Sequence, residues 1–157
     1  MKVLFNNFVF FTLISISSYG YSQVQINSIP KPIVFNSNTN TPLTSTELEM
    51  LQEVYGMALK KEILDRPSRL LVMKEILRNR VIIKEIKDPK NHKPCPRLSE
   101  VPIFDAFVSN LKRDISFQPS SFNPLKYNFE FHNPSIQRFK VEGSNFFIII
   151  KPQHYNK

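Results

Sequence analysis

Apolar residues recur every three or four positions over residues 45–64, which predicts an amphipathic helix. Thr44 and Glu47 form the pattern of a capping box at its start, and Leu43 and Leu48 form the matching hydrophobic staple. A second apolar stripe lies on nearly the opposite side of the same helix. We therefore expect one side to pack on its own domain and the other to be available to a partner.

The next part of the chain predicts a second helix and then a strand. Pro67 suits the first turn of a helix, and apolar residues follow at helical spacing to about Asn79. The β-branched run VIIKEI at 81–86 favours a strand, although a continuation of the second helix fits the same residues. After a proline-rich loop, apolar residues at helical spacing over 102–115 predict a short third helix.

The last part of the chain has the alternation of a β-sheet. KYNFEF at 126–131 alternates apolar and polar residues, and a second strand is expected for IQRFKV at 136–141, after which Gly143 offers a tight hairpin turn. FFIIIK at 146–151 is apolar on both faces, which is typical of a central strand. The sequence thus predicts an α+β fold, in which two N-terminal helices and a short third helix pack on a C-terminal antiparallel β-meander of three to four strands.

The first residues have the layout of a secretory signal peptide. Lys2 precedes an apolar run over residues 8–16, and small residues lead to a cleavage site after Ser22. We therefore expect residues 1–22 to be removed and the protein to be exported, periplasmic or extracellular, with no transmembrane anchor after cleavage. An uncleaved N-terminal anchor is the alternative. Residues 23–43 are expected to form an extended or flexible arm, and residues 44–157 a single α+β domain.

The positive charge is concentrated in one stretch. The chain carries a net charge of +8, and residues 60–97 hold 12 Lys and Arg against 5 Asp and Glu. Localised charge of this kind indicates a polyanion or an acidic partner surface, although ordinary solvated helix faces have the same composition. The binding residues that we infer from this stretch are Lys74, Arg78, Lys84 and Lys87.

Motifs for catalysis and metal binding are sparse. Only two glycines follow Ser22, which excludes the familiar phosphate-binding loops, and no G-x-S-x-G sequence is present. His92 and Cys95 would supply at most two ligands, whereas structural zinc usually needs four, so we expect no metal and no cofactor. Cys95 has basic neighbours that favour a reactive thiol, but it also fits an inert thiol or an intermolecular disulfide.

These patterns favour an exported, non-catalytic protein that binds another envelope or extracellular protein through the basic region 60–97. The alternative is a binder of anionic lipid head groups or acidic polysaccharide through the same residues. The third hypothesis is a cysteine-dependent enzyme that uses Cys95. We expect no nucleic acid partner, because an exported protein rarely meets nucleic acid and the alternating aromatic residues are typical of a sheet core.

Overall fold

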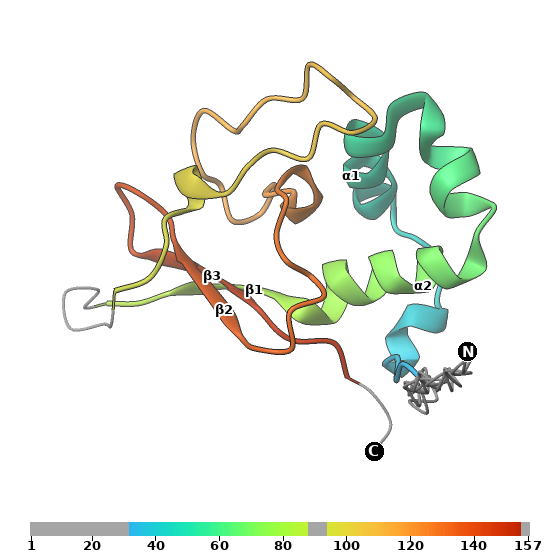
Figure 1. Cartoon of the computed structure of the whole chain (residues 1–157), viewed down its shortest axis with the longest axis horizontal. Helices are drawn as coiled ribbons and strands as arrows, with labels where there is room; N and C mark the ends of the chain where they lie inside the picture. Colours follow the sequence, from blue (N-terminus) through green and yellow to red (C-terminus); the bar gives the residue numbers. More distant parts are fainter. Residues whose placement is uncertain (1–31, 88–93, 155–157) are drawn as a thin grey trace, which may run out of the picture. The chain divides into compact units, whose positions relative to one another are not determined.

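The structure, a computed structural model, describes residues 32–87 and 94–154. The predicted signal peptide (1–22) and the first part of the arm (23–31) lie outside the described residues. They stay predictions, as does the division of the chain into an arm and one domain. The principal elements in the described part are α1 (Ser45–Tyr55), α2 (Pro67–Glu75), β1 (Val81–Glu85), β2 (Gln137–Lys140) and β3 (Phe146–Ile150), shown in Figure 1.

The predicted capping box starts α1. Thr44 Oγ1 accepts a hydrogen bond from the Glu47 backbone at 3.2 Å, and Glu47 Oε2 accepts one from the Thr44 backbone at 2.8 Å. The helical path then continues through a 3-10 turn at Gly56–Ala58 and a π-helical turn at Lys60–Leu64. The helix predicted over 45–64 is therefore confirmed, with an irregularity at Gly56 that periodicity does not indicate.

Gly56 has a conformation that only glycine adopts without strain. Its φ of 50° and ψ of −129° lie outside the regions open to other residues, and an added Cβ would lie 3.1 Å from Val108 Cγ2. Replacing Gly56 by Ala should therefore lower the free energy of unfolding by about 1–3 kcal/mol. Gly143→Ala is the control in urea denaturation, because Gly143 has φ of 66° but open space around it. If Gly56→Ala lost no more unfolding free energy than Gly143→Ala, the role given to the Val108 contact would be contradicted.

The second helix leads straight into the sheet. Pro67 occupies the first turn of α2, as predicted, and a π-helical turn at Ile76–Arg80 follows. The chain then enters β1, so the strand interpretation of 81–86 is confirmed and the alternative of a longer helix is wrong.

The sheet is antiparallel throughout, with the order β1-β3-β2. Gly143, with a φ of 66°, lies in the turn that joins β2 and β3, and the Val141 backbone donates to Phe146 O at 3.0 Å. The central position predicted for the last strand is therefore confirmed. The α+β class is confirmed too, but the helices come from the middle of the sequence and not from its N-terminal end.

The third helix predicted over 102–115 is wrong, because this segment is irregular. The Phe104 backbone donates to Lys126 O at 2.8 Å, so it bonds to a distant part of the chain and not to its own preceding turn. Phe104 and Phe107 both reach Tyr55, with ring centroids 6.2 and 5.0 Å from its ring. Their spacing thus reflects a shared contact with the end of α1.

The strand predicted over 126–131 is also wrong. Tyr127 and Phe129 are buried and alternate with exposed residues, as a strand would require. Their backbones nevertheless do not join the sheet. Tyr127 forms only an isolated antiparallel bridge with Ile103, and the next bonds are local, from Phe129 to Tyr127 O and from Phe131 to Phe129 O, each at 2.8 Å. The alternation therefore reports burial of one side of the segment in the core and not membership of the sheet.

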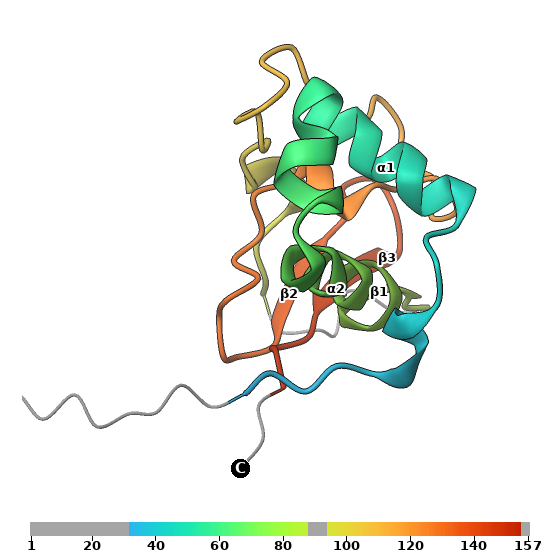
Figure 2. The ribbon, with the colours of Figure 1, turned by 90° about the vertical axis from the view of Figure 1, so that its right-hand side faces the viewer.

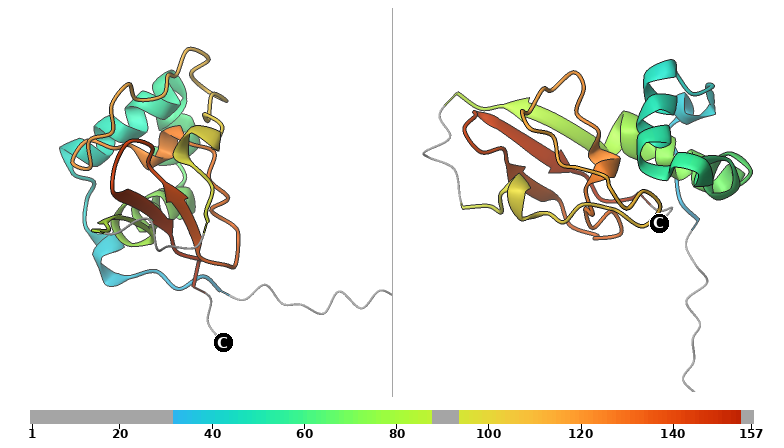
Figure 3. Two further views of the ribbon diagram at one scale, coloured as in Figure 1. Left: turned by 90° about the vertical axis from the view of Figure 1, so that its left-hand side faces the viewer. Right: turned by 90° about the horizontal axis from the view of Figure 1, so that it is seen from above.

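Two apolar clusters hold the described residues together. The first joins one face of the sheet to the irregular segment, and its buried members are Leu98, Val101, Phe122, Tyr127, Phe129, Val141, Ile148 and Ile150. The second joins α1, α2 and Leu125. Figures 2 and 3 show the two helices grouped beyond the end of the sheet at which β1 begins, while irregular chain lies over the sheet. The layer on the sheet is thus mainly irregular chain.

Candidate functional site

Lys74, one of the four predicted binding residues, is used inside the fold. It is buried, and its Nζ donates to Thr39 O at 3.2 Å and to Thr41 O at 2.7 Å. Lys74 therefore fastens the polar segment that precedes α1 onto α2, and it does not face a partner.

Arg78 has the same role one turn later. Its guanidinium forms two hydrogen bonds to Glu47, with Nε 2.5 Å from Oε1 and Nη2 2.6 Å from Oε2. It also donates to Pro42 O at 2.8 Å and to Thr41 Oγ1 at 2.7 Å. The bonded guanidinium lowers the pKa of Glu47, and the carboxylate raises the pKa of Arg78. The charge of Arg78 is thus already balanced by Glu47 within the fold.

Lys84 and Lys87 are placed differently. Lys84 lies on β1, Lys87 follows the strand, and both side chains are exposed. The four predicted residues therefore do not form one surface, since two fasten the segment before α1 and two remain available at the sheet.

The sheet brings Lys84 together with two cations that the sequence did not single out. In the strand register Lys84, Phe147 and Lys140 form one row across β1, β3 and β2. Arg138 stands in the next row, on the same face. Because neighbouring strands lie about 4.8 Å apart, the backbones of Lys84 and Lys140 are about 10 Å apart. We call Lys84, Arg138 and Lys140 the basic face.

The basic face is opposite to the face that packs in the first apolar cluster. Within residues 32–87 and 94–154, none of its three cations forms an ion pair with Asp or Glu. Because side chains alternate along a strand, β2 places Arg138 and Lys140 on the face opposite Phe139. The sequence could not show that β1 adds Lys84 to the same face, because that depends on a pairing across more than 50 residues.

The outer edge of β1 has no neighbouring strand in the described part of the chain. Lys151 N donates to Arg80 O and Ile86 N to Asn145 O, so the even-numbered residues of this stretch face β3. The backbones of Val81, Ile83 and Glu85 consequently point outward. The Val81 N–H is already bonded to Ile76 O.

A cavity of about 310 Å³ adjoins this edge. Val81 and Ile83 line it from the strand, and the start of α1 and the loop near Phe122 line it from the two sides. The edge therefore offers both unpaired backbone groups and space for side chains of an added segment.

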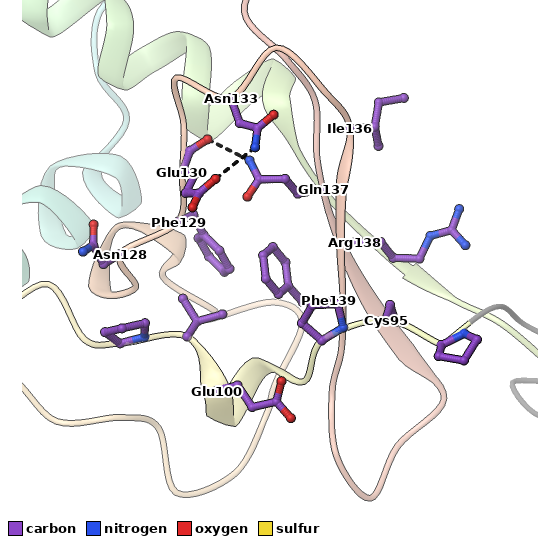
Figure 4. Close-up of a pocket in the computed structure, with 14 residues that line it drawn as sticks. Cys95, Glu100, Asn128, Phe129, Glu130, Asn133, Ile136, Gln137, Arg138 and Phe139 are labelled. Carbon is purple, nitrogen blue, oxygen red and sulfur yellow. Dashed lines mark hydrogen bonds between the residues drawn. The ribbon is translucent and has the colours of Figure 1, made fainter.

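Cys95 lines a larger cavity of about 720 Å³, which adjoins β2 at the opposite edge of the sheet. Its thiol-bearing side chain is partly exposed. Figure 4 shows the rings of Phe129 and Phe139 side by side in this cavity, with centroids 5.0 Å apart. Neither His132 nor His154 lines it, and His92 lies outside the described residues. The described lining thus offers the thiol no imidazole base, and a reactive Cys95 stays a prediction.

No three His, Cys, Asp or Glu side chains come together to hold a metal ion in the described ranges. None of the helices in this part of the chain is long and apolar enough to cross a membrane. Comparisons of the chain with protein-family models, with curated proteins and with solved structures found no match.

Proposed function

We propose that this is an exported, non-catalytic protein that binds an extended acidic segment of another envelope or extracellular protein along the outer edge of β1. The observation that carries the proposal is the unpaired edge of β1, which lies beside a cavity and next to the basic face. An extended chain that adds to such an edge gains main-chain hydrogen bonds, while alternate side chains enter neighbouring pockets.

The backbone geometry sets how many bonds an added strand can form. Ile83 offers both its N–H and its C=O, Glu85 offers the same two groups, and Val81 offers its C=O. Each such bond contributes about 1 kcal/mol net, so several together with apolar contacts support a specific complex. Ile82 is 38 % exposed on the basic-face side and is available for such a contact.

The charge supports an acidic partner. Lys84 stands on the edge strand and Lys87 follows it, while Arg138 is exposed and Lys140 partly exposed on β2. The proposal keeps only the strand part of the basic stretch 60–97 in the contact region and adds Arg138 and Lys140 from β2. Lys74 and Arg78 are left out because they are bonded within the fold.

Neutralising the basic face should weaken retention of the partner. We expect the triple change Lys84→Ser, Arg138→Ser and Lys140→Ser to reduce recovery from an envelope fraction about tenfold or more, since several charge contacts are lost together. The matched control replaces the exposed residues Lys60, Lys61 and Lys112 by Ser. It removes the same net charge as the first triple variant, but from other parts of the surface. Equal losses in both triple variants would count against a contact at the sheet.

A second candidate function is binding to an anionic surface, namely lipid head groups or acidic polysaccharide. The row of Lys84 and Lys140 on either side of Phe147 favours it, because no acidic group balances these charges within the described residues. Purely electrostatic binding should weaken steeply between low and physiological salt and should not depend on the backbone of β1. Binding to an added strand should depend on that backbone at every salt concentration.

A further inference from the structure

A second, independent site lies between α1, α2 and the irregular segment. Two adjoining cavities of about 700 and 540 Å³ share the residues that separate them, which are Tyr55, Met73, Ile76, Phe104, Phe131 and His132. Each has the size usual for a small-molecule site. Because six lining residues are common to both, we treat them as one cleft and call it the Tyr55 cleft.

Most of the lining is apolar and aromatic. The rings of Tyr55, Phe104 and Phe107 lie together at one wall, with Phe104 and Phe107 centroids 5.9 Å apart. The charged groups at the cleft are already bonded. Arg69 Nη1 lies 2.7 Å from Glu62 Oε2, and Arg80 Nε donates to Lys151 O at 3.0 Å. Glu130 Oε2 accepts a hydrogen bond from Asn133 Nδ2 at 2.9 Å. Such a lining favours a neutral, flat molecule over an ionised one.

The Tyr55 hydroxyl is a buried polar group of the cleft with only a weak hydrogen-bond acceptor. Tyr55 is 8 % exposed, and within the described residues its hydroxyl donates only to Met73 Sδ, at 3.8 Å. A thioether is a weak acceptor, whereas buried Tyr hydroxyls usually have a strong one. Burial raises the pKa of Tyr55, so the hydroxyl keeps its proton and remains a donor.

We propose that the Tyr55 cleft binds a neutral, flat, apolar molecule that carries one carbonyl oxygen, and that Tyr55 Oη donates a hydrogen bond to this oxygen. The aromatic wall packs on the flat body of the ligand, and the carbonyl replaces Met73 Sδ as the acceptor. This site does not depend on the basic face, because it is built from other residues.

The test uses 6-propionyl-2-(dimethylamino)naphthalene, a neutral fluorophore with one ketone, and its analogue 2-(dimethylamino)naphthalene, which lacks the ketone. The wild-type protein should bind the ketone with a saturable 1:1 isotherm, and Tyr55→Phe should weaken that binding about threefold to tenfold, the effect of one hydrogen bond. The same Tyr55→Phe substitution should change the affinity for the analogue by less than about twofold, because the analogue has no carbonyl to accept the hydrogen bond.

Two further variants keep the result interpretable. Ser68→Trp places a large ring at a lining residue and should reduce binding of both probes, while Met57→Ala, at a fully exposed position, should change neither. If Tyr55→Phe does not fold, as judged by circular dichroism, the test is the ratio of the two affinities of the wild-type protein. The proposal then requires the wild type to bind the ketone at least threefold more tightly than the analogue. Absence of saturable binding, or equal affinity of wild type and folded Tyr55→Phe for the ketone, would overturn the proposal.

Discussion

Replacing Arg78 by Met should lower the free energy of unfolding by about 2–4 kcal/mol, the largest loss of stability that we expect from a single change. The side chains of Arg78 and Glu47 are only 12 % and 13 % exposed, and removing one partner leaves a desolvated carboxylate without its cation. The same change removes the bonds to Thr41 Oγ1 and Pro42 O that hold the segment before α1 on α2.

Urea denaturation of four proteins measures this effect: wild type, Arg78→Met, Glu47→Gln and the double variant. The loss of unfolding free energy in the double variant should be smaller than the sum of the losses in the two single variants, because each single change leaves the other group buried without its partner. Arg78→Lys should recover only part of the loss, since an ammonium cannot bond both oxygens of Glu47 in the planar fork of a guanidinium. Simple additivity of the two single changes would contradict the coupling.

The same pair predicts a dependence on pH. The Arg78 hydrogen bond lowers the pKa of Glu47 in the folded protein below its ordinary value of 4.5. The folded state therefore binds this proton less readily, so the stabilisation is fully present above about pH 4.5 and is lost as pH falls through the folded pKa. The difference in unfolding free energy between wild type and Arg78→Met should narrow when the urea experiment is repeated at about pH 3.

Short-range signals in the sequence were sufficient for the helix starts and the hairpin. The capping box at Thr44, the proline at position 67 and the glycine at position 143 act within a few residues, so each could be interpreted without knowing the rest of the fold. The same holds for β3, because its consecutive apolar residues indicate directly that both of its faces are covered.

Long-range contacts account for the errors. Phe104 and Phe107 have helical spacing because both contact Tyr55, and Tyr127 and Phe129 alternate because one side of an irregular segment is buried. Lys74 and Arg78 have the composition of a solvated helix face, yet the segment that precedes α1 covers them. No pattern within the helix could reveal a partner more than 30 residues away.

The candidate site was only half predictable for the same reason. Lys84 was expected from the local excess of positive charge. Arg138 and Lys140 join it only through the pairing of β1 and β2 with β3, and the open edge of β1 is a property of strand order. Strand order cannot be deduced from alternation alone.

Replacing Glu85 by Pro should reduce retention of the protein partner about tenfold, the largest effect on binding that we expect from a single change. The Glu85 N–H points away from β3, so proline removes a donor that only an added strand would use, and its ring stands in the path of that strand. Proline is tolerated on edge strands in this orientation, and the Glu85 side chain is exposed, so the three-stranded sheet should remain intact.

Glu85→Ala is the matched control, because it removes the same carboxylate and keeps the backbone N–H. Circular dichroism and the unfolding midpoint in urea must be similar for the two variants, which shows that any difference in binding arises at the edge. A binder of anionic surfaces would treat the two variants alike, since they have the same charge.

The most direct measurement is therefore the fraction of partner that Glu85→Pro and Glu85→Ala each retain from an envelope fraction at physiological salt. Binding by strand addition to β1 predicts that Glu85→Ala retains the partner as the wild type does and that Glu85→Pro retains about one tenth as much. Equal retention by the two folded variants, or recovery of no partner by the wild type, would contradict the account.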